Sequence, residues 1–182
     1  MLKTFAEHTL DTSLLKRGCT VLDVGCRGFA FGDALRKRFA ANVYEVDIDD
    51  LGSSRPYYRV GIADFNGLGG VRGLEPEGRR LVPGADVPVY TIDSFKETLG
   101  VDHWDVIKLD CEGSEYDILR DMESPPATQI TVEFHQHTTA RRTETFMNAL
   151  IERLERWYRV RRHRLYGKPG SLNYWDSLFT LK

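Results

Sequence analysis

The feature that most constrains the fold is a short stretch, Val21–Gly28, that reads VLDVGCRG. A brief apolar run leads into Asp23, and Gly25 and Gly28 follow before a helical pattern begins near Phe31. Glycine permits positive φ and lets the backbone approach a ligand closely, so this spacing predicts the first strand–turn–helix of a nucleotide-binding α/β domain. The alternative interpretation is an ordinary strand–turn–helix in which the glycines serve only the turn.

The acid in this motif bears on which ligand the turn would bind. Asp23 stands two residues before Gly25, at a position that dinucleotide folds usually keep apolar because a carboxylate would repel the pyrophosphate. S-adenosylmethionine carries an ammonium and a sulfonium group and no phosphate, so Asp23 favours it as the cofactor. An NAD-dependent oxidoreductase would need G-x-G-x-x-G, which Gly25-Cys26-Arg27-Gly28 does not supply.

Composition limits the class of protein. The 182 residues suit one domain, 1–182, with a short helical lead-in at about 1–18. The formal net charge of −2 provides no basic field to recruit nucleic acid, which makes a nucleic-acid partner unexpected. Three cysteines without C-x-x-C spacing indicate reduced thiols, and no signal peptide or membrane-length apolar run is present, so we expect a cytoplasmic protein with no membrane partner.

The order of predicted elements defines the fold class. Strands alternate with helices and end in two consecutive strands, so we expect an α/β three-layer sandwich with a mostly parallel sheet and an antiparallel C-terminal edge. Residues 64–85, rich in glycine, proline and charge, are predicted to form a loop. The predicted strands are 20–24, 42–48, 57–63, 87–95, 104–109, 129–134, 158–166 and 174–181, and the predicted helices are 4–17, 31–39, 114–122 and 143–157.

Acidic residues follow nearly every predicted parallel strand, at the edge where such sheets bind ligands. Asp47 is expected to accept hydrogen bonds from the ribose hydroxyls, with Glu45 and Asp49 as rivals that strand alternation cannot separate. Asp64 is expected near the adenine amine, or else in a simple turn. The complete expected cofactor set is Asp23, Gly25, Cys26, Gly28, Asp47, Ile48, Ala63, Asp64 and Asp110.

The segments VLDVG, IDSF, IKLDCEGSEYDIL and ITVEFH together resemble the FkbM-type family of S-adenosylmethionine-dependent methyltransferases over about residues 18–136. The resemblance implies a class I methyltransferase (Rossmann-like) fold and O-methylation of a hydroxyl on a sugar or other secondary metabolite. It implies a cofactor turn at Asp23, Gly25 and Gly28 and a ribose acid at Asp47. The family signature falls on Asp110, Glu112 and Glu115. Arg27 departs from the usual small or polar residue and is expected to point outward or pair with an acid.

Methylation of a hydroxyl needs a group that removes its proton. His135 is the expected general base, with Glu133 or Asp110 as its orienter or as the alternative base, because Glu133 and His135 share one strand face. A surface histidine beside His137 is the competing interpretation. No metal is expected, although Asp110, Glu133 and His135 form a possible divalent-cation set.

Two broader alternatives concern activity and assembly. A non-catalytic or divergent scaffold of the same fold that binds an adenosyl ligand is the alternative function, but it would tolerate loss of the strand-end acids that this chain retains. The expected partner is a small-molecule or glycan acceptor with a hydroxyl. A homo-oligomer is also expected to be possible, since a short catalytic core can borrow its lid from a second copy.

Overall fold

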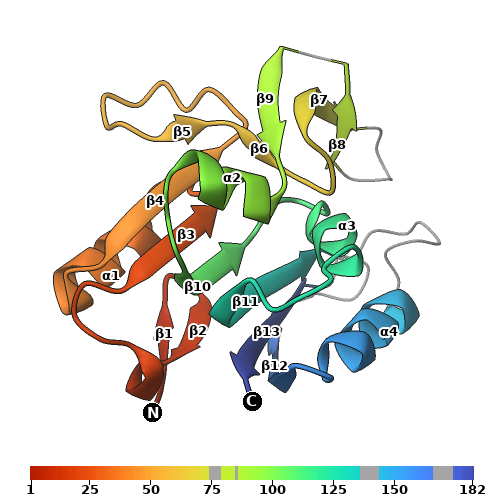
Figure 1. Cartoon of the computed structure of the whole chain (residues 1–182). Coiled ribbons are helices and arrows are strands. Elements are labelled where there is room, and N and C mark those ends of the chain that lie inside the picture. The colour runs from red at the N-terminus through yellow and green to blue at the C-terminus, as the bar shows by residue number, and fades with distance from the viewer. Residues whose placement is uncertain (74–78, 85, 136–143, 166–173) are drawn as a thin grey trace.

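A seven-stranded sheet forms the centre of the molecule in the computed structural model, which describes residues 1–73, 79–84, 86–135, 144–165 and 174–182. The strand order is β12-β13-β11-β10-β3-β4-β5 (Figure 1). Neighbouring strands from β11 to β5 are parallel, whereas β13 lies antiparallel between β11 and β12. The strands are β3 (Thr20–Val24), β4 (Asn42–Asp47), β5 (Tyr58–Arg59), β10 (Trp104–Leu109), β11 (Ala127–His135), β12 (Tyr158–Leu165) and β13 (Tyr174–Leu181).

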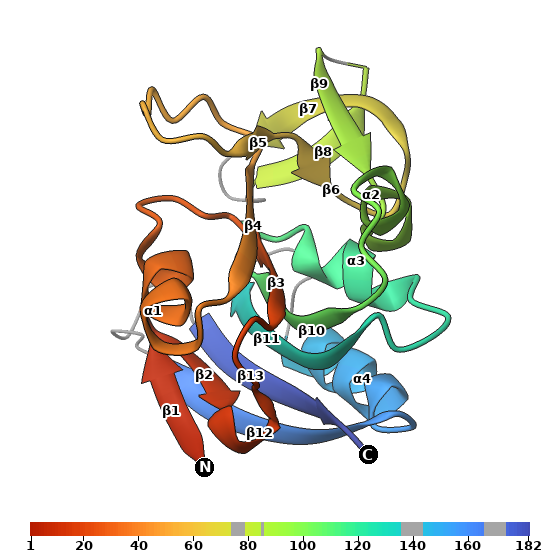
Figure 2. The same ribbon diagram turned by 60° about the vertical axis from the view of Figure 1, so that its left-hand side comes forward.

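Helices cover both faces of this sheet, which confirms the predicted three-layer α/β architecture (Figure 2). Helix α1 (Ala30–Phe39) lies on one face, where a small core includes Phe31 and Leu35. The other face packs against α2 (Ile92–Thr98), α3 (Glu115–Arg120) and α4 (Glu144–Leu154) through a larger core. No helix in the described parts of the chain has the length and apolar character needed to cross a membrane.

The predicted helical lead-in is wrong, because a β-hairpin occupies that part of the chain. Strands β1 (Leu2–Phe5) and β2 (His8–Asp11) pair antiparallel, and the 3₁₀ turn η1 (Thr12–Leu14) follows. The two residues between the strands, Ala6 and Glu7, have φ of 43° and 74°, as the tight primed hairpin turns require. The hairpin packs beside α1, and Leu10 of β2 is fully buried.

The predicted loop at 64–85 instead contributes two strands to a second sheet. Strands β7 (Gly67–Gly73) and β8 (Arg79–Pro83) join β6 (Gly61–Ile62) and β9 (Val87–Tyr90) in the order β6-β9-β7-β8. One of the glycines that favoured a loop, Gly69, serves close packing between strands, since a Cβ there would lie 2.7 Å from a side-chain carbon of Val89. The predicted strand at 57–63 is accordingly divided between the two sheets as β5 and β6.

Candidate functional site

A cavity of about 120 Å³ opens at the carboxyl ends of β3, β4 and β10. The carboxyl ends of parallel strands meet at one edge of a sheet, so loops that are distant in sequence converge there. Apolar and acidic side chains share the cavity wall. The lining residues are Val24, Gly25, Arg27, Val46, Asp47, Ile48, Asp49, Val60, Gly61, Ile62, Asp110, Cys111, Glu112 and Ser114.

The glycine turn shapes this cavity through close backbone contact. Gly25 has a φ of +76°, and its N–H donates to the Val46 carbonyl oxygen at 2.9 Å. A Cβ at this position would lie 1.9 Å from the Asp110 carbonyl oxygen, so no other residue fits without moving β10. Gly28 also has a positive φ of +80°, but no atom stands within 4 Å of where its Cβ would be.

The structure separates Asp47 from its two rivals at the end of β4. Asp47 and Asp49 line the cavity, whereas Glu45 accepts hydrogen bonds from Arg36 at 2.7 Å and Arg55 at 2.9 Å. Asp47 Oδ1 accepts the Asp49 backbone N–H at 3.0 Å, and burial raises the pKa of Asp47. Glu45 therefore has a structural role, and Asp47 is the buried carboxylate at the cavity.

The residues predicted to bind the cofactor after the third strand differ in their relation to the cavity. Ala63 and Asp64 are not among the residues that line the 120 Å³ cavity, although their neighbour Ile62 is. Asp64 Oδ2 instead accepts a hydrogen bond from Arg120 of α3 at 3.0 Å. Ile62, at the end of β6, lines the cavity, whereas the Asp64 carboxylate does not.

A second cavity of about 370 Å³ adjoins the first and contains Asp23. The ammonium of Lys108 lies 3.1 Å from Asp23 Oδ1 and 3.4 Å from Asp110 Oδ2, and it donates to the Gly25 carbonyl oxygen at 2.7 Å. Burial alone would lower the pKa of Lys108, but the charges of Asp23 and Asp110 outweigh burial and raise it. Asp23 was predicted to favour a cationic cofactor. Its carboxylate already has a cation beside it, the Lys108 ammonium.

Residues 26 and 27 occupy different environments within the turn. Cys26 is buried and lines the second cavity, and burial raises the pKa of its thiol to about 12, which disfavours a thiolate at neutral pH. Arg27 is exposed and lines both cavities. Its guanidinium is therefore available to a ligand that extends from one cavity to the other.

His135, the expected base, is held by a carboxylate that the sequence analysis did not choose as its orienter. Glu115 Oε1 accepts the backbone N–H of His135 at 2.8 Å and lies 3.2 Å from its Nδ1. Burial opposes protonation of His135, but the Glu115 charge and hydrogen bond outweigh it and raise the pKa to about 9. Complete burial of Glu115 would raise the pKa of its carboxyl, but the interaction with His135 outweighs burial and lowers it. The ring is therefore fixed with Nε2 directed away from Glu115.

The other side of the His135 ring faces the remaining predicted catalytic acids. Nε2 lies 3.7 Å from Asp110 Oδ1 and 3.6 Å from Glu133 Oε1. Burial and the Asp110 charge raise the pKa of Glu133. Burial also opposes ionisation of Asp110, but His8 and Lys108 outweigh it and lower that pKa. The three residues assigned to catalysis are thus brought together at the ends of β10 and β11.

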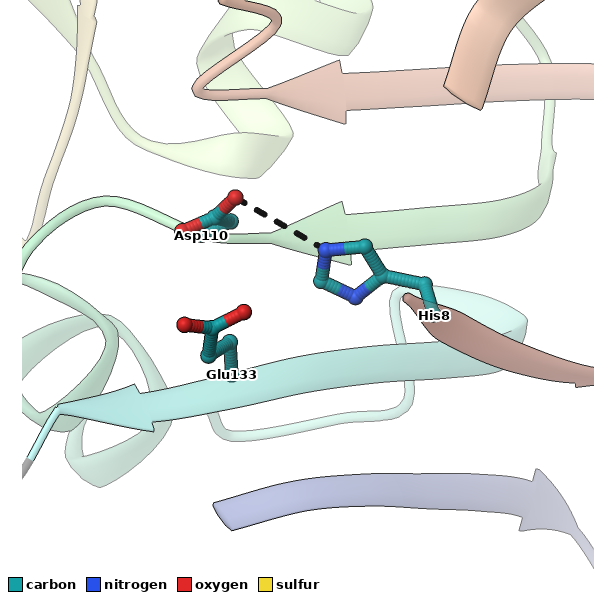
Figure 3. Close-up of side chains that lie close together, drawn as sticks. All are labelled: His8, Asp110 and Glu133. Atoms are coloured by element: carbon teal, nitrogen blue, oxygen red, sulfur yellow. Dashed lines mark ion pairs between the residues drawn. The ribbon is translucent and has the colours of Figure 1, made fainter. Parts of the chain in front are cut away.

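Three site residues were missed by sequence reasoning. A signal existed for Lys108, because a lysine inside a buried strand requires acidic partners. Glu115 was assigned to the family signature, but no contact with His135 was predicted for it. No sequence signal identified His8, because its segment was predicted to be a helix and forms a hairpin instead. The His8 side chain is 2% exposed, and its Nε2 lies 3.7 Å from Asp110 Oδ2 (Figure 3).

Comparison with known proteins adds independent findings. The family model described as the methyltransferase FkbM domain matches residues 31–164. Among solved structures, TrmK of M. capricolum, in complex with the cofactor product S-adenosyl-homocysteine, has a TM-score of 0.52 at 12% identity over 95% of this chain and 69% of that one. An rRNA methylase of Streptococcus thermophilus has a TM-score of 0.45 at 10% sequence identity, over 94% of this chain and 92% of that one. No curated protein sequence matches significantly. The comparison with TrmK shows a shared fold.

Proposed function

This chain belongs to the FkbM methyltransferase family, and on that premise we propose that it transfers the methyl group of S-adenosylmethionine to a hydroxyl of a small molecule or glycan. The observation that carries the proposal is the cavity at the ends of β3, β4 and β10, where the Gly25 turn, Asp47 and Asp110 converge. A ligand in this cavity contacts backbone, apolar side chains and carboxylates at once.

The residues of the two cavities fit the parts of this cofactor. Ile48, Val60 and Ile62 provide apolar walls for an adenine ring, and the Asp47 carboxylate can accept from ribose hydroxyls. Asp23, whose buried carboxylate lies 3.1 Å from the Lys108 ammonium, lines the second cavity together with Arg27. The ammonium of an amino-acid end would share Asp23 with Lys108, and the carboxylate of that end suits Arg27.

The chemistry then requires alignment and removal of one proton. The bound cofactor supplies a methyl carbon that accepts an oxygen lone pair while the carbon–sulfur electron pair stays on sulfur. His135 Nε2 takes the proton of the acceptor hydroxyl, and Glu115 holds the ring in the orientation that directs Nε2 to the acceptor. Asp110 and Glu133 flank this nitrogen and complete a polar surface for the acceptor.

The decisive experiment is calorimetry of the purified protein with S-adenosylmethionine, S-adenosylhomocysteine and NAD, measured side by side. Micromolar binding of the two adenosyl-sulfur ligands without binding of NAD supports the proposal, and a screen of hydroxyl acceptors with labelled cofactor follows. A folded protein that binds neither adenosyl-sulfur ligand would contradict it.

Replacing Asp47 tests the ribose contact. We expect Asp47→Ala to weaken S-adenosylhomocysteine binding by about 1–3 kcal/mol, or roughly 5- to 150-fold in Kd, because a buried carboxylate that accepts hydroxyl hydrogen bonds is lost. Calorimetry measures the change. Asp50→Ala is the matched control, since Asp50 is 69% exposed and does not line the cavity. Equal affinities in the two variants would remove Asp47 from this role.

The pH dependence of turnover tests the base. His135 accepts a proton only when its ring is neutral, and its pKa is raised to about 9. We therefore expect the rate to rise with pH below 9 and to level off above it. Glu115→Gln removes a charge that raises this pKa, so the midpoint should move to lower pH. Initial rates of the wild type and of Glu115→Gln, measured from about pH 6 to 10, give the midpoint of each pH–rate curve. The same midpoint in the two proteins would exclude His135 as the titrating base.

A further inference from the structure

We propose that His8, Asp110 and Glu133 bind a divalent metal ion of the Mn²⁺ type. The three side chains come from β2, the end of β10 and β11, and they point toward one another (Figure 3). One donor atom of each lies within 4.8 Å of the donor atoms of the other two. One imidazole with two carboxylates is a ligand set that divalent first-row metals accept.

The hydrogen bonding of His8 determines which ring nitrogen faces the carboxylates. Thr131 Oγ1 donates its only proton to Asp176 Oδ1 at 3.2 Å, so toward His8 Nδ1, 3.4 Å away, it acts as an acceptor. In a neutral ring Nδ1 then carries the hydrogen and Nε2 carries a lone pair. That lone pair points at carboxylate oxygens, an arrangement that a bound cation stabilises. The long Thr131 contact lies on the ring nitrogen that usually makes the orienting contact in metal-ligating histidines.

The spacing of His8 and Asp110 fits a shared cation better than a direct hydrogen bond. His8 Nε2 lies 3.7 Å from Asp110 Oδ2, beyond the 2.7–3.2 Å of an N–H···O bond. Two ligands that are each about 2.1 Å from one metal ion are separated by roughly 3–4 Å. The 3.7 Å between His8 Nε2 and Asp110 Oδ2 therefore matches the distance between two ligand atoms of one metal ion.

The local charge leaves room for two positive charges. Lys108 is the ammonium nearest to Asp110, at 3.4 Å, and it also lies 3.1 Å from Asp23. Protonated His135 lies near Asp110, Glu115 and Glu133 and adds a second positive charge. Ionised Asp23, Asp110, Glu115 and Glu133 still outnumber Lys108 and His135 by two charges when His8 is neutral. A divalent ion would balance the cluster.

The role of the ion rests on the proposed function. Three protein ligands leave coordination positions open, and the cluster adjoins the second cavity, which His8 and Asp110 both line. A hydroxyl oxygen bound there would be polarised as by a Lewis acid, so its proton leaves more easily before the oxygen attacks the methyl carbon. The ion would also position the acceptor between His135 and the cofactor cavity.

Titration with Mn²⁺ tests the site without any cofactor present. Metal-stripped protein is titrated with MnCl₂, and the free ion is measured by its electron paramagnetic resonance signal. We expect one equivalent to bind, and His8→Gln and Glu133→Gln each to raise the Kd by about tenfold or more. His103→Gln is the matched control, because His103 is exposed and bonds Thr128 at the opposite end of β10, and it should bind as the wild type does.

The outcomes separate this inference from the proposed function. Absence of stoichiometric Mn²⁺ binding, or equal binding by all three variants, overturns the metal site. Calorimetry with S-adenosylhomocysteine on the same metal-stripped protein tests the cofactor cavity on its own. Mn²⁺ binding without adenosyl-ligand binding would therefore support the metal site and contradict the methyltransferase proposal. If buried His8→Gln fails to fold, the half-buried Glu133→Gln variant decides the question.

Discussion

Gly25→Ala is expected to prevent folding or to lower the free energy of unfolding by at least about 3 kcal/mol, the largest effect among single substitutions at the site. The new Cβ would lie 1.9 Å from the Asp110 carbonyl oxygen, a backbone atom that cannot rotate away. The residue would also have to adopt a φ of +76°, which L side chains disfavour. Relief would require the end of β3 to separate from β10, and the cavity between them would lose its shape.

Gly28→Ala is the matched control for this experiment. Its φ of +80° imposes a similar backbone strain, but nothing stands within 4 Å of the added Cβ. We expect this variant to lose only about 1–2 kcal/mol. Chemical denaturation of the two proteins, with circular dichroism as the readout, measures both values. If the two variants lose equal stability, backbone strain alone explains the glycines, and the close contact of Gly25 with β10 contributes nothing.

The central sheet was predictable because its signals are local and strong. Short, mostly apolar runs such as Trp104–Leu109 are typical of buried strands, and the helix–strand alternation then favours parallel pairing. The same reasoning failed at the N-terminus, where His8 and Leu10 belong to a hairpin. Its short strands carry little periodicity, and their burial depends on contact with α1 and β11, which are distant in sequence. Tertiary packing decided the structure there.

In the candidate site, too, features set by local sequence could be predicted, and features set by contacts between distant elements could not. Asp47 and Asp110 follow strands, so their place at the ligand-binding edge could be predicted. The partners of each acid could not, because they depend on side-chain geometry across elements. Asp64 pairs with Arg120 of α3, and Asp23 lies beside Lys108 of the neighbouring strand. A carboxylate at a strand end therefore identifies the edge but not whether its charge remains available to a ligand.

His135→Ala is expected to lower turnover by about 10²- to 10⁴-fold while leaving the affinity for S-adenosylhomocysteine within a few-fold of the wild type. The ring nitrogen that would accept the hydroxyl proton is lost, whereas His135 is not among the residues that line the 120 Å³ cavity. Single-turnover rates with labelled cofactor measure the first effect, and calorimetry measures the second. Substitution of the exposed His103 by alanine provides the control for loss of a histidine.

A second variant separates chemistry from stability, because alanine at this position also removes a partner of the fully buried Glu115 carboxylate. His135→Asn retains an N–H that can donate to Glu115 but has no nitrogen able to accept a proton. We expect it to melt closer to the wild type than the alanine variant does and to be equally slow. A His135→Asn protein with wild-type turnover would exclude proton transfer to this ring. Of the two alternative bases, Glu133 would then be favoured over Asp110, because the pKa of Glu133 is raised and that of Asp110 is lowered.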